Sequence, residues 1–60
     1  MSKNTIYEKI GKRVKEAREI SGMTQADLAD KVGVSVTYIS SIERGLSFPR
    51  GEVLVGILNA

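Results

Sequence analysis

The sequence predicts a small all-α domain. The chain has 60 residues, which is enough for one domain with one small core. Glycines at Gly22, Gly33 and Gly45 divide it into stretches whose apolar residues have helical spacing. No stretch alternates apolar and polar residues as a half-buried strand would. We therefore expect a single domain over residues 1–60 that consists of helices only.

The first helix is expected from Thr5 to about Ser21. Thr5 and Glu8 have the spacing of a capping box, and Gly22 supplies a stop. At about 100° per residue, five apolar residues fall within about a third of the circumference. This expected buried face consists of Ile6, Ile10, Val14, Ala17 and Ile20. Arg13 falls inside the same arc, and we expect its charged end to extend to solvent.

The second helix is expected to follow a capping box formed by Thr24 and Asp27 and to run to Val32. Only Gly33 and Val34 separate it from the next helix. So short a link requires a sharp turn. Gly33 can adopt the left-handed conformation that ends the second helix.

The third helix is expected to begin at an N-cap, Ser35, and to end near Arg44. Its predicted buried face consists of Tyr38, Ile39, Ile42 and Leu46. Its opposite face holds small hydroxyl residues and one arginine, namely Thr37, Ser40, Ser41 and Arg44. Such a face suits close approach to the major groove of DNA, which is about 12 Å wide. A plain solvated face is the alternative interpretation.

The fourth segment, residues 50–60, is apolar on more than one side. Its apolar residues are Val53, Leu54, Val55, Ile57 and Leu58. Gly51 and Gly56 each disfavour a helix interior by about 1 kcal/mol relative to alanine. We expect part of this surface to meet another segment or another subunit.

Composition excludes several classes of function. The chain has no cysteine and no histidine, which removes disulfides, thiolate or imidazole metal sites and histidine-dependent catalysis. We expect no catalytic residue, no metal and no cofactor. No apolar run approaches the roughly 18 residues of a membrane span, and residues 1–10 lack the apolar region of a signal peptide, so we expect neither a membrane protein nor a secreted one. A net charge of +2 permits nucleic-acid binding without arguing for it.

Residues 10–50 resemble the helix-turn-helix domain of the phage-repressor and Cro class, the XRE family of transcriptional regulators. The most specific stretch is TQADLADKVGVSVTYISSIERG, residues 24–45. The resemblance implies a compact, lambda-repressor-like domain of four helices, or a five-helix domain shortened at its end. It also implies a cytoplasmic, nucleoid-associated homodimer that binds operator-like double-stranded DNA with the third helix in the major groove.

The resemblance also implies roles for single residues. Val36, Thr37 and Ser41 match positions that touch base edges. None of them can hold adenine by two hydrogen bonds, as the glutamines of well-known phage repressors do, so we expect a larger contribution from DNA shape. Arg18 and Glu43 match an ion pair between the first and third helices. Phosphate contacts are expected from Gln25, Ser35, Ser40 and Arg44.

Three functions follow from these observations. The leading hypothesis is a sequence-specific DNA-binding transcriptional regulator that acts as a repressor. The second is a protein-interaction module of the same fold, such as an antitoxin or a bridging factor, which the doubly apolar fourth segment favours. The third is the DNA-targeting domain of a larger protein.

Overall fold

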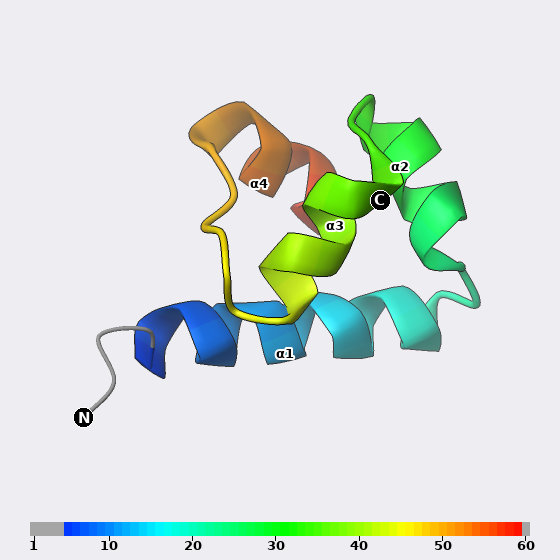
Figure 1. Ribbon diagram of the computed structural model, residues 1–60. Helices are drawn as coiled ribbons and strands as arrows, with labels where there is room; N and C mark the ends of the chain where they lie inside the picture. Colours follow the sequence, from blue (N-terminus) through cyan, green and yellow to red (C-terminus); the bar gives the residue numbers. More distant parts are fainter. Residues whose placement is uncertain (1–4, 60) are drawn as a thin grey trace.

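The computed structural model describes residues 5–59, which form four helices: α1 (Thr5–Ile20), α2 (Gln25–Val32), α3 (Val36–Glu43) and α4 (Gly51–Leu58). Within this range no strand occurs, so the all-α prediction is confirmed. In Figure 1, α1 runs along one side of the domain, and the three shorter helices lie together on the other. None of the described helices is long and apolar enough to cross a membrane.

The helix ends follow local signals in the sequence. Thr24 Oγ1 accepts a hydrogen bond from the backbone N–H of Asp27, and the Asp27 carboxylate accepts one from the backbone N–H of Thr24, both at 3.0 Å. At the start of α3, Ser35 Oγ accepts from the backbone N–H of Tyr38 at 3.1 Å. Gly33 has φ 84°, the left-handed conformation that only glycine adopts at little cost. The predicted capping box of Thr24 and Asp27, the N-cap Ser35 and the left-handed stop at Gly33 are therefore confirmed.

The core is small and contains residues from every helix. Its buried side chains are Val14, Leu28, Ala29, Ile39, Ile42, Val53 and Ile57. Ile39 and Ile42 of α3 are fully buried. Helix α3 packs against α1 and α2, and α2 packs against α4. The core thus fixes one side of α3 and leaves its other side at the surface.

Helices α1 and α3 approach so closely at Gly11 that no side chain fits there. A Cβ atom on Gly11 would overlap the backbone carbonyl oxygens of Ile42 and Glu43. Gly11 and Val14 are accordingly the two buried residues of α1, and Arg18 is half-buried one turn further on. The crossing therefore decides which side of α1 faces the core.

The predicted buried face of α1 is wrong at three residues. Ile6 and Ile20 are 64% and 86% exposed, and Ala17 is exposed as well. The contact at Gly11 rotates this side of α1 away from α3. In addition, α1 has 16 residues and α3 only eight, so both ends of α1 extend beyond α3 (Figure 1).

Leu46 is also more exposed than predicted, at 57%. Helix α3 ends at Glu43, and Gly45 has φ 79°. The chain has left the helix before Leu46, so the angle that placed Leu46 beside Ile39 no longer applies.

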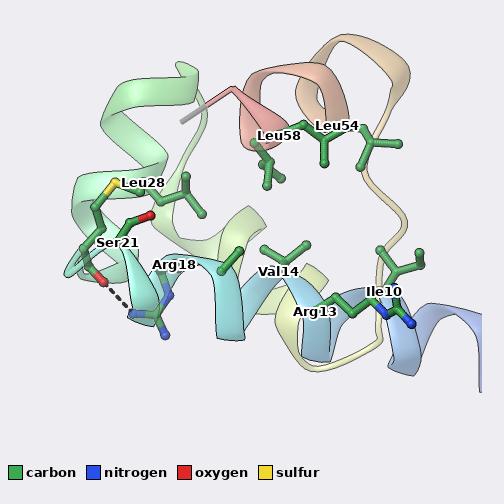
Figure 2. A pocket seen from close by; sticks show the side chains of 11 residues that line it. Ile10, Arg13, Val14, Arg18, Ser21, Leu28, Leu54 and Leu58 are labelled. Carbon is green, nitrogen blue, oxygen red and sulfur yellow. Dashed lines mark hydrogen bonds between the residues drawn. The ribbon is translucent and has the colours of Figure 1, made fainter.

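A groove of about 240 Å³ lies between α1 and α4. Figure 2 shows Leu54 and Leu58 of α4 on one side of it, opposite Ile10 and Val14 of α1. Arg13 also lines the groove and is exposed, as expected for a long cationic side chain beside apolar surface. Helix α4 is apolar on two sides, as predicted, because Val55 and Leu58 are 56% and 75% exposed.

Candidate nucleic-acid interface

The outer side of α3 carries the three residues predicted to contact bases. Val36 is 44% exposed and Thr37 is exposed, both in the first turn of the helix. Ser41 lies one turn later and is half-buried. In helix-turn-helix proteins, the N-terminal residues of the recognition helix reach the base edges. Val36 and Thr37 therefore lie in the turn of α3 that corresponds to the base-contacting turn of a recognition helix.

The residues predicted to contact phosphate differ in their exposure. Ser35 and Arg44 are exposed at opposite ends of α3, as its N-cap and C-cap. The Ser35 oxygen already accepts the capping bond, but its hydroxyl hydrogen is still available for a phosphate oxygen. Ser40 and Gln25 are half-buried. Gln25 is the first residue of α2.

A bidentate ion pair between Arg18 and Glu43 joins α1 to α3. Arg18 Nε lies 2.7 Å from Glu43 Oε2, and Arg18 Nη2 lies 3.2 Å from Glu43 Oε1. The two side chains are only 11% and 3% exposed. Arg18 Nη1 also donates to the backbone carbonyl of Met23 at 2.9 Å, the dashed line in Figure 2. The bond to Glu43 raises the pKa of Arg18 above its ordinary value, so Arg18 stays charged.

Gln25 adds a third helix to this pair. Its Nε2 donates to Glu43 Oε1 at 2.9 Å, so one carboxylate accepts hydrogen bonds from α1 and from α2. The sequence indicated a phosphate role for Gln25 and a pairing role for Glu43, but not their contact. They lie 18 positions apart in the sequence, and the spacing of residues within α2 or within α3 gives no information about a contact between the two helices.

Arg50 is a candidate phosphate contact that the sequence did not indicate. The hydroxyl of Tyr38 accepts from the backbone N–H of Arg50 at 3.3 Å and donates to the carbonyl of Phe48 at 3.4 Å. The guanidinium of Arg50 lies 5.7 Å from the centre of the Tyr38 ring, an attractive position for a cation. Arg50 and Ser35 line one surface hollow beside the start of α3. A positive charge thus lies near the end of α3 that presents Val36.

Helices α2 and α3 are both capped and are joined by the three residues 33–35. One side of α3 is exposed beside cationic side chains. The chain matches the helix-turn-helix family over residues 14–60. It is a helix-turn-helix domain of the XRE type. The relatives below are described as transcriptional regulators, and none of them is described as an enzyme.

Several transcriptional regulators are similar to the helix-turn-helix domain. The HTH-type transcriptional regulator SinR of Bacillus subtilis is 49% identical over 37 residues, which cover 62% of this chain and 33% of SinR. The HTH-type transcriptional regulator ImmR of Bacillus subtilis is 36% identical over 50 residues, 83% of this chain and 39% of ImmR. Transcriptional regulator ClgR of Mycobacterium tuberculosis is 36% identical over 55 residues, 92% of this chain and 49% of ClgR. The chain thus spans between a third and a half of these relatives.

Proposed function

We propose that this chain is the double-stranded DNA-binding domain of a transcriptional regulator and that α3 enters the major groove. The observation that carries the proposal is the division of α3 into two sides. Ile39 and Ile42 are fully buried, whereas the first turn exposes only Val36 and Thr37. A helix that presents small side chains can approach base edges closely in a groove about 12 Å wide. The names of the relatives favour the same function.

Base reading is assigned to Val36, Thr37 and Ser41. Val36 and Thr37 each offer a methyl group that can pack on the C5-methyl of thymine, and Thr37 and Ser41 each offer one hydroxyl. Positioning on the DNA backbone is assigned to Gln25, Ser35, Ser40 and Arg44, with Arg50 as a further candidate. Backbone contacts fix the register of the protein and carry little sequence information.

We further propose that the domain acts as a homodimer in the cytoplasm, at the nucleoid. The dimer would repress transcription by occupying an operator-like site. Val55 and Leu58 are exposed on α4, and Leu58 lines the groove shared with α1, which supports an apolar contact between subunits. A two-fold dimer would place its two α3 helices about 34 Å apart, which is one turn of DNA.

Selection of bound duplexes from a random pool tests this function. The variants Val36→Ala, Thr37→Ala and Ser41→Ala should each lose about 1–2 kcal/mol at particular base pairs and little on mixed-sequence DNA. Replacement of thymine by uracil across the selected site removes only methyl groups, so it should weaken binding at one or two positions. Unchanged site preference in all three variants, together with tolerance of uracil, would show that α3 reads no base edges.

The second candidate is a protein-interaction module, and the groove between α1 and α4 favours it. The groove is lined mainly by apolar side chains, among them Ile10, Leu54 and Leu58. Absence of binding to any duplex at low salt, with the fold intact, would support this second function over the first.

A further inference from the structure

The amide of Gln25 can face the carboxylate of Glu43 in only one orientation. A carboxylate accepts hydrogen bonds and cannot donate them, so the NH₂ end of the amide must point toward it. That group has two N–H bonds about 120° apart, and Glu43 takes one of them. Within residues 5–59, the side chain of Gln25 makes no other hydrogen bond. The second N–H is therefore left for a partner outside the domain.

The anchor that orients Gln25 is rigid before DNA arrives. The Glu43 side chain is 3% exposed, and Arg18 of α1 donates a hydrogen bond to each of its carboxylate oxygens. A side chain that is already fixed loses little further freedom on binding, which favours the bound state. Arg18 also supplies a positive charge beside the Glu43 carboxylate, which would otherwise repel a phosphate close to Gln25.

We infer that Glu43 is a positioning residue for DNA binding, because its carboxylate, held by Arg18, aims the free amide N–H of Gln25 at a DNA phosphate. The inference rests on the proposed function, since it assigns one of the contacts through which the domain would hold DNA. It adds that Gln25 depends on a residue of α3 and a residue of α1 that do not themselves touch the DNA. The ion pair then acts in recognition as well as in folding.

A double-mutant cycle on DNA affinity tests this dependence. Gln25→Ala is measured in the native background and in the background Arg18→Met with Glu43→Leu, where neither charge is left unpaired. The probe is a mixed-sequence duplex of about 20 base pairs, two helical turns, at low salt. In the native background the loss should be about fivefold to tenfold. In the uncharged background Gln25→Ala should cause almost no further loss. Circular dichroism confirms that every variant compared is folded.

Two outcomes would overturn the inference while DNA binding itself stands. Equal losses in both backgrounds would mean that Gln25 reaches phosphate without Glu43. No loss in the native background would mean that Gln25 does not touch DNA. Failure of the unmodified chain to bind the duplex would instead overturn the proposed function, and the inference with it.

Nuclear magnetic resonance of the unmodified chain provides a test that needs no variant to fold. Gln25 is the only glutamine, so its side-chain NH₂ gives one identifiable pair of proton signals. Before DNA is added, one proton should exchange slowly with water. On addition of the duplex, the other should move downfield. The side-chain amide of the exposed Asn59 is the internal control and should change little. Equal, fast exchange of both Gln25 protons would contradict the inference.

Discussion

Gly11 is a residue at which no side chain is tolerated without a shift of the backbone. The carbonyl oxygens that a Cβ atom would meet belong to the backbone of α3, so they cannot move without displacing the whole helix. Gly11→Ala should therefore cost about 3 kcal/mol or more, a large share of the stability of so small a domain. Thermal unfolding followed by circular dichroism measures this cost.

Gly51→Ala is the matched control for Gly11→Ala. Nothing lies within 4 Å of a Cβ atom at Gly51, which begins α4. This substitution should leave stability unchanged or raise it by up to about 1 kcal/mol, because alanine favours the helix. A Gly11→Ala variant that melts with the Gly51→Ala variant would show that α1 and α3 do not cross at this point.

The ion pair of Arg18 and Glu43 should show strong non-additivity. Arg18→Met or Glu43→Leu leaves one nearly buried charge without its partner, so each should cost about 3 kcal/mol or more. The double substitution removes both charges and should cost less than the sum. Melting curves of the three variants give the coupling. Additive effects below about 0.5 kcal/mol would reduce the pair to an ordinary surface contact.

Single residues also show where sequence-based prediction ends. The pairing of Arg18 with Glu43 could be expected from family resemblance, and the cap at Ser35 from its residue type. The closeness of Gly11 to Ile42 could not, because a glycine within a helical pattern does not reveal what lies opposite. The bond from Gln25 to Glu43 was missed for a similar reason, since it depends on how α2 and α3 cross.

At the scale of helices, the capping box of α2 should make stability depend on pH. The hydrogen bonds from Thr24 lower the pKa of Asp27 below its ordinary value. The stabilisation is therefore complete above the unfolded-state pKa and is lost as the pH falls through the lower folded-state pKa. Denaturant midpoints measured below about pH 4 should fall with pH, and Asp27→Asn should weaken this dependence.

Asp30→Asn is the control for the capping box, because Asp30 is an exposed carboxylate of the same helix and lies outside the box. It should retain the acid dependence of the unmodified chain. If Asp27→Asn and Asp30→Asn respond alike to acid, the capping bond does not carry the effect.

The ends of the helices were more predictable than their buried sides. Caps and left-handed glycines act within a few residues, so Thr24, Ser35 and Gly33 are sufficient to locate the ends of α2 and the start of α3. The buried side of α1 depends on where another helix crosses it. The apolar arc alone therefore predicted that Ile6 and Ile20 are buried, whereas both are exposed in the structure.

For the whole molecule, DNA affinity should fall steeply with salt. A dimer that makes about six phosphate contacts predicts a slope of about −5 for the logarithm of affinity against the logarithm of salt concentration. Arg44→Ala should lower the slope by about one unit per charge removed and weaken binding equally on all sequences. Gln25→Ala, which removes no charge, should weaken binding with little change in slope. Fluorescence anisotropy at several salt concentrations measures both, and a flat salt dependence would contradict phosphate contacts.

Self-association should depend on α4. Leu58→Asp puts a charge on an apolar side chain that is 75% exposed beside the groove, so it should weaken the dimer. Ile20→Asp is the control, because Ile20 is equally apolar and 86% exposed but lies at the end of α1, outside the groove. Sedimentation at tens of micromolar should show association for the unmodified chain and for Ile20→Asp. A strictly monomeric chain, both free and on DNA, would rule out this interface.

The two sides of α3 also bear on how such a domain changes over generations. Ile39 and Ile42 hold the helix in place, whereas Val36 and Thr37 contribute nothing to the core. Substitutions at exposed positions usually change stability by no more than about 0.5 kcal/mol. If α3 reads DNA as proposed, a duplicated gene can acquire a new DNA target through a few codon changes at Val36 and Thr37, with no compensating change elsewhere. The DNA target can then change while every intermediate sequence still encodes a folded domain.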